Sequence, residues 1–186
     1  MQTFLPFADF ERSVLALDSK RLGKQRVETL QIVRALTWAD YGWANHPAVL
    51  MWKGYEEALG RYGFACCEAW IDRGFGDSCA ATIAVDLRSA GVDVVRTQSE
   101  LAAAGALPAW LGDDDLHRSH QSSLVRKDPE HYRPLFPGVP DDLPYVWPVR
   151  SEAVLERERR AHERQHLKRS RAAQKPWQTR RRNASL

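Results

Sequence analysis

The sequence has few cysteines, no long hydrophobic run and few signals typical of β-strands. Cys66, Cys67 and Cys79 form neither a paired disulfide framework nor a CxxC motif, so we expect reduced and mostly buried thiols. No stretch approaches the roughly 18 uncharged apolar residues that a membrane span requires, and the N-terminus lacks the features of a signal peptide. We therefore expect a cytoplasmic protein that has no membrane partner.

An excess of positive charge is also missing from most of the chain. Residues 150–186 contain 12 Lys and Arg against 4 Asp and Glu, a net charge of +8. Residues 1–149 contain 15 Lys and Arg against 20 Asp and Glu, a net charge of −5. This asymmetry excludes a uniformly basic surface, so a polyanion must be bound by a local basic patch, by the C-terminal segment, or by both.

Helical periodicity dominates what is present, within a composition typical of one soluble globular domain. Apolar spacing and capping residues predict helices over 18–39, from Pro47 past Trp70 to the stop at Gly74, over 77–89, 99–104 and 113–127. Five prolines between 134 and 148 exclude regular structure, so Phe136, Val139, Tyr145 and Trp147 are expected to form an extended strap across the core. Residues 151 to about 173 can form a helix with little apolar face, and 174–186 are expected to be disordered.

The predicted fold is therefore all-α. It has one compact helical domain over residues 1–149, with long first and second helices and a Pro-rich extended strap, followed by a basic C-terminal helical extension over residues 150–186.

A polar stripe follows one face of the first predicted helix. Helical spacing places five side chains on this stripe: Arg21, Lys24, Gln25, Glu28 and Gln31. They form either an ordinary solvated helix face or a phosphate-binding face that carries an acid. Because phosphates repel a carboxylate, an acid on such a face needs a chemical reason, such as stabilising a developing positive charge or moving a proton.

Three motifs resemble those of one family. Arg21-Leu-Gly-Lys-Gln-Arg-Val-Glu28 is similar to the signature of the pyrimidine dimer DNA glycosylases of the phage endonuclease V type, and Glu28 falls on the catalytic Glu. The segment from His46-Pro-Ala to Arg73-Gly-Phe75 resembles the family's second long helix, and residues 117–132 resemble its C-terminal helix and aromatic DNA-contacting stretch. The resemblance, which extends in order to about residue 137, is greatest to a bacterial branch of the family.

This resemblance implies that residues 1–149 form a helical DNA glycosylase-like domain. Its members bind bent duplex DNA, extrude a nucleotide and attack the anomeric carbon of the deoxyribose. We therefore predict excision of a damaged or bulky modified pyrimidine, with repair of pyrimidine dimers or removal of modified phage bases as the two roles. The alternative is a catalytically inactive helical DNA- or RNA-binding protein on the same scaffold.

The nucleophile is where the sequence departs from the family. The phage enzyme uses the α-amine of a Thr exposed by removal of Met, whereas position 2 here is Gln, whose bulk prevents that removal, and the first Thr is Thr3. Three routes remain: attack by the Met1 α-amine, attack by Lys20 or Lys24, or attack by water with help from Glu28. The missing N-terminal Thr favours water or a weak amine route. Our predicted catalytic residues are therefore Glu28, Met1 and Lys24.

The resemblance and the residue types together predict the DNA contacts. Trp43 and Trp147 lie in predicted loops, where they can stack on an extruded base. The spacing of His117, His120 and His131 fits no zinc motif, so we expect neither a metal nor a cofactor. The only partner expected is double-stranded DNA, with no obligate protein partner. The predicted DNA-binding residues are Lys20, Arg21, Gln25, Gln31, His46, His117, Arg118, His120, Gln121, Arg126, Lys127 and Tyr132.

Overall fold

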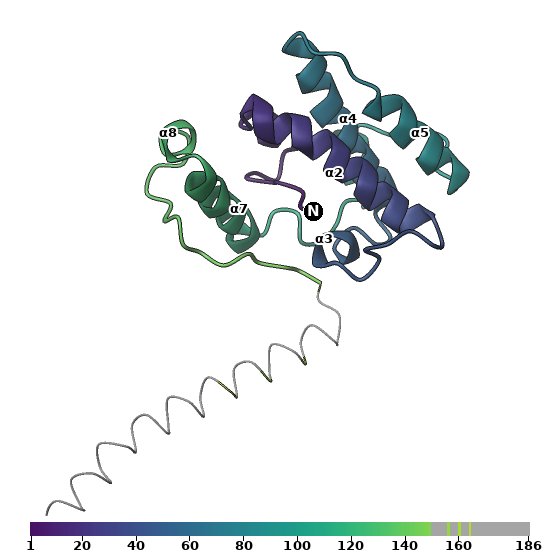
Figure 1. The fold of residues 1–186 in the computed structure, drawn as a ribbon. Coiled ribbons are helices and arrows are strands. Elements are labelled where there is room, and N and C mark those ends of the chain that lie inside the picture. Colours follow the sequence, from purple (N-terminus) through teal and green to yellow (C-terminus); the bar gives the residue numbers. More distant parts are fainter. Residues whose placement is uncertain (150–155, 157–159, 161–163, 165–186) are drawn as a thin grey trace, which may run out of the picture. The chain divides into compact units, whose positions relative to one another are not determined.

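A computed structural model describes residues 1–149 and, beyond them, only residues 156, 160 and 164. The chain divides into two units, residues 1–149 and residues 150–186, and Figure 1 shows the helices of the first unit. Apart from those three positions, the predicted helix over 151–173 and the predicted disordered segment over 174–186 lie outside the described residues. None of the helices described is long and apolar enough to cross a membrane.

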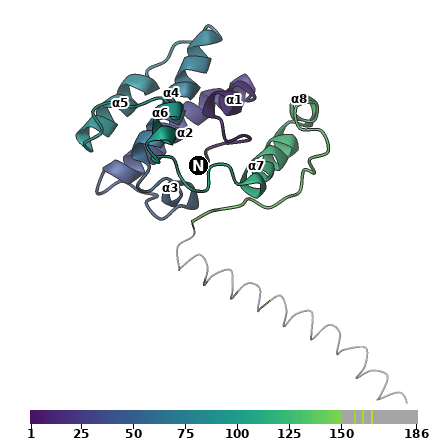
Figure 2. The same cartoon turned by 180° about the vertical axis from the view of Figure 1, so that it is seen from behind.

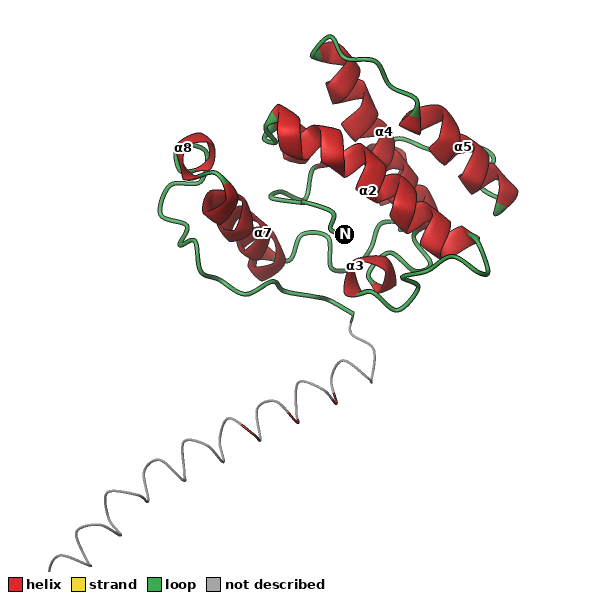
Figure 3. Ribbon diagram, in the orientation of Figure 1, coloured by secondary structure: helices red, strands yellow, loops and turns green. Residues whose placement is uncertain are grey.

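The described residues form helices and no strands, which confirms the all-α fold class (Figure 3). The helices are α1 (Phe10–Leu15), α2 (Ser19–Thr37), α3 (Pro47–Leu50), α4 (Glu56–Asp72), α5 (Cys79–Ser89), α6 (Gln98–Ala103), α7 (Asp114–Lys127) and α8 (Pro129–Tyr132).

Helices α2, α4 and α5 pack against one another and form the main part of the core. The close approach of α4 to α2 and α5 depends on Gly63 of α4. A Cβ added there would lie 2.8 Å from Thr29 Cγ2 of α2 and 3.0 Å from Ile83 Cδ1 of α5. Figure 2, which shows the molecule from behind, places α1 and α6 on the other side of this group. Helix α2, which carries the polar stripe, thus has one face fixed against two other helices.

Local capping places the starts of α2 and α7 where the sequence predicted them. The side chain of Asp18 accepts hydrogen bonds from the backbone N–H groups of Lys20 and Arg21 at the start of α2. Asp113 caps α7 in the same way. Because a cap needs only residues within one turn, these boundaries follow from the sequence alone. The short helix α1, capped by Asp9, was not predicted.

The prediction of one continuous helix from Pro47 past Trp70 is wrong, because the chain breaks between α3 and α4. Gly54 adopts φ +84, a left-handed conformation that ends the helical path, and the Glu56 side chain accepts a hydrogen bond from its N–H group. Trp52, within the break, is fully buried and donates from Nε1 to Thr3 Oγ1. The break therefore directs Trp52 inward, against the N-terminal segment.

The Pro-rich segment after α8 has no regular structure, as predicted, and runs beside α7. Phe136 and Val139 are buried in the core. Serine hydroxyls of α7 accept hydrogen bonds from the N–H groups of Leu143 and Val146. This strap carries Tyr145 to the side of the molecule where the N-terminus lies.

Candidate active site

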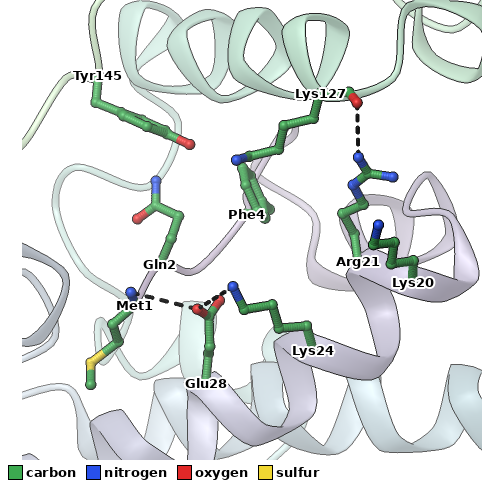
Figure 4. A pocket seen from close by; sticks show the side chains of 9 residues that line it. All are labelled: Met1, Gln2, Phe4, Lys20, Arg21, Lys24, Glu28, Lys127 and Tyr145. Carbon is green, nitrogen blue, oxygen red and sulfur yellow. Dashed lines mark hydrogen bonds and ion pairs between the residues drawn. The ribbon is translucent and has the colours of Figure 1, made fainter.

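A pocket of about 390 Å³ lies between the N-terminal segment, α2, the end of α7 and the strap (Figure 4). Helix α2 supplies four of its residues, three of which (Arg21, Lys24 and Glu28) belong to the polar stripe. The residues that line the pocket are Met1, Gln2, Phe4, Lys20, Arg21, Lys24, Glu28, Lys127 and Tyr145.

Glu28 stands between two amines in this pocket. Its Oε1 atom is 3.5 Å from the α-amine of Met1 and 3.5 Å from Nζ of Lys24, one helical turn earlier. The Met1 side chain is only 5% exposed, whereas the Lys24 side chain is 73% exposed. The structure thus brings together the three predicted catalytic residues, with one amine inside the pocket and the other reaching from its edge.

The N-terminal segment has no regular structure, and Gln25 of α2 holds it in place. The N–H of Phe4 donates to Gln25 Oε1 at 2.9 Å, and Gln25 Nε2 donates to the carbonyl of Gln2 at 2.6 Å. Because Gln25 lies three residues before Glu28, this pair of hydrogen bonds fixes the first residues of the chain beside the carboxylate.

Two histidines of α7 hold the next residue, Leu5. The N–H of Leu5 donates to His120 Nδ1 at 3.0 Å, and His117 Nδ1 donates to the carbonyl of Leu5 at 2.8 Å. Burial, and then the neighbouring His117, lowers the pKa of His120 to about 3. His120 is therefore neutral at physiological pH, consistent with a ring nitrogen that accepts from a backbone N–H.

Four residues predicted to bind DNA are buried and bond to other groups of the protein. Gln25, His117 and His120 satisfy backbone groups of residues 2–5 instead. Tyr132 is fully buried and its hydroxyl donates to Asp18. Burial and the adjacent Asp18 carboxylate raise the pKa of this phenol. In this structure these side chains support the fold, because irregular backbone in a protein interior needs polar partners, and their contact with DNA stays a prediction.

Three other predicted DNA-binding cations lie at the pocket: Lys20, Arg21 and Lys127. The Arg21 guanidinium already has partners within the protein. Its NH1 is 3.2 Å from Asp18 and 3.3 Å from Asp128, and its NH2 donates to the carbonyl of Lys127. No ion pair is formed within the described residues by Lys20 or by Lys127. These cations create a local basic patch on an otherwise acidic unit.

The remaining predicted residues lie outside the pocket lining. Gln31 is half-buried on α2, and Gln121 donates to the carbonyl of Pro6. Arg118 and Arg126 donate to backbone carbonyls of Gly138 and Asp141, next to or within the strap. The structure therefore does not gather these side chains with Glu28.

His46 caps α3, with Nδ1 accepting from the N–H of Ala48, and it makes edge contacts with Trp43 and Trp147. Burial and the charge of the Met1 amine lower the pKa of His46, and Glu28 opposes them. Trp43 is 64% exposed and has φ +78, an uncommon conformation outside glycine. The exposed indole of Trp43 thus contacts a histidine whose pKa is shifted by the charges of Met1 and Glu28.

Sequence reasoning missed three pocket residues: Gln2, Phe4 and Tyr145. The buried hydrophobic character of Phe4 and the position of Tyr145 in the strap gave no signal of a pocket. Gln2 was noticed only as a residue that prevents removal of Met1.

Within the described residues, no group of three or more His, Cys, Asp or Glu is placed to hold a metal ion.

Comparison with known proteins gives a family match for the first part of the chain. A family model described as pyrimidine dimer DNA glycosylase matches residues 1–82, which include the first two motifs but not the third. Neither the curated proteins nor the solved structures contained a match. The matched segment contains Met1, Gln25, Glu28 and the cations of α2. Residues 1–82 of this chain are thus similar to the pyrimidine dimer DNA glycosylase family.

Proposed function

We propose that the protein excises a damaged or bulky modified pyrimidine from duplex DNA, with Glu28 as the central catalytic residue. The observation that carries this proposal is the carboxylate of Glu28, a residue only 8% exposed, which lies 3.5 Å from each of two amines in a pocket edged by cations. A buried acid in this setting can stabilise positive charge on the sugar or accept a proton from an attacking amine.

In the proposed reaction, Glu28 takes a proton from the α-ammonium of Met1 and the free amine attacks C1′ of the deoxyribose. The C1′–N glycosidic bond breaks, and the base leaves with the bonding electron pair. The departed base is then protonated. The attached amine loses a proton, and the resulting N,O-acetal opens by cleavage of the C1′–O4′ bond with protonation of O4′. This gives a Schiff base, from which the strand can be cut by elimination. The distance of 3.5 Å between the Met1 α-amine and Glu28 Oε1 supports this amine route, one of those that the sequence left open.

The pocket supports binding of an extruded nucleotide. Lys20, Arg21, Lys24 and Lys127 suit the flanking phosphates, and Phe4 and Tyr145 provide aromatic surface nearby. Both substrate classes, pyrimidine dimers and bulky modified bases of phage DNA, fit these features, and the second would make the protein a phage-defence enzyme. The substrates to compare are therefore irradiated, unmodified and phage-modified DNA.

The test is base release from these three DNAs by the wild-type protein and by Glu28→Gln. We expect the wild-type protein to produce abasic sites in the irradiated or the phage-modified DNA. The rate of base release should fall at least about 100-fold in Glu28→Gln, because the variant keeps the shape of the side chain but cannot accept a proton. DNA affinity should stay equal or rise, since one negative charge is removed. The matched control is Glu11→Gln, which makes the same change at an exposed position of α1.

Full turnover in Glu28→Gln would remove Glu28 from the chemistry. Binding without base release from any of the three DNAs would favour the catalytically inactive nucleic-acid-binding protein instead.

A further inference from the structure

Gln2 lines the pocket with a side-chain amide whose hydrogen bonding is incomplete. The residue is 8% exposed, and its Oε1 position is buried without a hydrogen-bond partner among the described residues. Its Nε2 position lies 3.3 Å from Nε2 of His120. A buried polar group without a partner is rare in native structures. The orientation of this amide therefore depends on whether the facing nitrogen of His120 donates or accepts a hydrogen bond.

The protonation state of His120 follows from its other contact. The backbone N–H of Leu5 can only donate, and it points at His120 Nδ1 at 3.0 Å, so Nδ1 carries the lone pair. Burial lowers the pKa of the ring to about 3, and the neutral ring therefore carries its proton on Nε2. His120 Nε2 is a donor, and it can bond only to an acceptor on Gln2.

The amide of Gln2 must therefore present its oxygen to His120. Rotation by 180° about the last side-chain bond exchanges the amide O and N with almost no change in shape. After this exchange, the oxygen accepts from His120 Nε2–H and lies on the side of the Tyr145 hydroxyl, which points toward this amide in Figure 4. The NH2 group then occupies the position that has no partner within the described residues.

Resting on the proposed function, we propose that Gln2 determines specificity by donating a hydrogen bond from this NH2 group to a carbonyl oxygen of the extruded base. The group is already shielded from water and held by His120. It therefore loses little hydration when an acceptor arrives, and an acceptor satisfies a donor that is otherwise unpaired.

The position of Gln2 favours a base over a phosphate as the ligand. In Figure 4, Gln2 and Tyr145 lie on the left of the pocket, whereas Lys20 and Arg21 lie on the right. Lys20 and Arg21 suit phosphates on that side, and the amines of Lys24 and Lys127 lie between them and Gln2. The neutral amide beside an aromatic ring suits the edge of a pyrimidine, which carries a carbonyl at O2 in every natural case.

The first experiment measures discrimination rather than turnover. We compare affinity for a duplex with one cyclobutane thymine dimer, a duplex with one bulged thymidine, and a matched regular duplex, all in the Glu28→Gln background. Adding Gln2→Glu, which still accepts from His120 but cannot donate, should lower the preference for the better-bound irregular duplex about tenfold. Asn45→Asp, the same change at an exposed position, should leave that preference unchanged.

Gln2→Met, which removes the amide without adding charge, should lower the preference by a similar factor. A merely structural role for Gln2 would weaken binding to irregular and regular duplexes equally. Unchanged preference in both Gln2 variants would overturn the proposal.

The second experiment is nuclear magnetic resonance of the ¹⁵N-labelled protein. We expect a proton on His120 Nε2 in the free protein and a Gln2 side-chain amide signal that shifts with the irregular duplex but not with the regular one. A proton on His120 Nδ1, or a Gln2 signal that ignores DNA, would overturn the proposal.

The two proposals fail in distinguishable ways. Base release that is insensitive to Gln2 substitution would leave the proposed function standing and remove the role of Gln2. A Gln2-dependent preference without any base release would do the opposite. No preference for either irregular duplex would overturn the role of Gln2, whereas base release from irradiated or phage-modified DNA would still support the proposed function.

Discussion

Glu28 shows how much chemistry one residue can acquire from its neighbours. Its carboxylate is removed from most of the solvent, and each of two amines lies 3.5 Å away. In partly desolvated surroundings a nearby opposite charge acts more strongly than it does in water. The carboxylate can thus hold an amine in place and accept its proton, and Lys24 keeps a second cation at the pocket edge.

The first prediction at this scale identifies the amine. Borohydride should trap a covalent protein–DNA complex through Met1, because the Met1 amine lies inside the pocket whereas Lys24 is largely exposed. Adding two residues before Met1 should abolish trapping by displacing the α-amine. The measurement is trapping on a substrate that the wild-type protein cleaves, with the labelled peptide located by mass spectrometry.

Lys24→Arg is the matched control, since it keeps the charge beside Glu28 but cannot form a Schiff base. Trapping that disappears in Lys24→Arg would assign the reaction to Lys24. Base release without any trapping would support attack by water.

The second residue-scale prediction concerns stability at low pH. His120 has a pKa of about 3 in the folded protein and an ordinary value of 6.5 when unfolded. The unfolded state therefore binds a proton first as pH falls below 6.5, and stability is lost progressively down to about pH 3. Between pH 7 and pH 5, this residue should lower the free energy of unfolding by about 2 kcal/mol.

The measurement is urea unfolding at both pH values for the wild-type protein and for His120→Gln. The variant should be less stable at pH 7 but lose about 2 kcal/mol less on acidification, because it has no ring to titrate. Equal losses in the two proteins would show that His120 does not titrate in this window.

At the scale of elements, the first six residues behave as an irregular strand held by side chains. Gln25 from α2, Tyr62 from α4 and His117, His120 and Gln121 from α7 bond to its backbone groups. Three helices thus replace the ladder partners that a sheet would supply. The consequence is an N-terminus fixed beside Glu28 rather than a frayed end.

The prediction at this scale tests the contact nearest to the pocket. Gln25→Met should lower the free energy of unfolding by about 2 kcal/mol or more, because the Phe4 N–H and the Gln2 carbonyl lose their partner in a buried setting. Base release should fall further than DNA affinity, since the amine is no longer held near Glu28. Both are measured on the same preparation.

Gln31→Met supplies the stability control, because it makes the same substitution at a half-buried position of α2. A loss of stability as large in Gln31→Met as in Gln25→Met would mean that the two bonds of Gln25 contribute little.

At the scale of the whole molecule, charge is divided unevenly. Residues 1–149 carry a net charge of −5, so their pocket cations form a local exception, and residues 150–186 carry +8. Phosphate neutralisation contributes strongly to affinity, with a salt dependence that grows with the number of contacts. The C-terminal segment is thus expected to add affinity for DNA of any sequence.

Truncation after Arg150 tests this division. It should leave the helical signal and thermal transition of residues 1–149 intact, lower the affinity for undamaged DNA, and flatten the dependence of affinity on salt. Turnover at saturating DNA should change little, because the pocket residues all lie before position 150. A truncated protein that fails to fold would show that the segment is needed for packing.

The sequence by itself determined the local features of this protein. Helix α2 begins after Asp18 because a cap acts within one turn, and Lys24 reaches Glu28 because residues four apart share a helix face. The strap could be predicted from five prolines, since each removes a backbone donor. The motif ending at Glu28 led to the same family that the comparison found over residues 1–82.

Only the tertiary structure decided which polar side chains face the pocket and which hold the backbone. Gln25 and Lys24 are neighbours on the same predicted stripe, yet Gln25 turns inward to the N-terminal segment. Leu5 and His120, separated by 115 residues, meet because α7 packs beside that segment. A buried polar side chain and an exposed one look the same in a sequence, because the difference lies in the backbone groups that a distant segment leaves without partners.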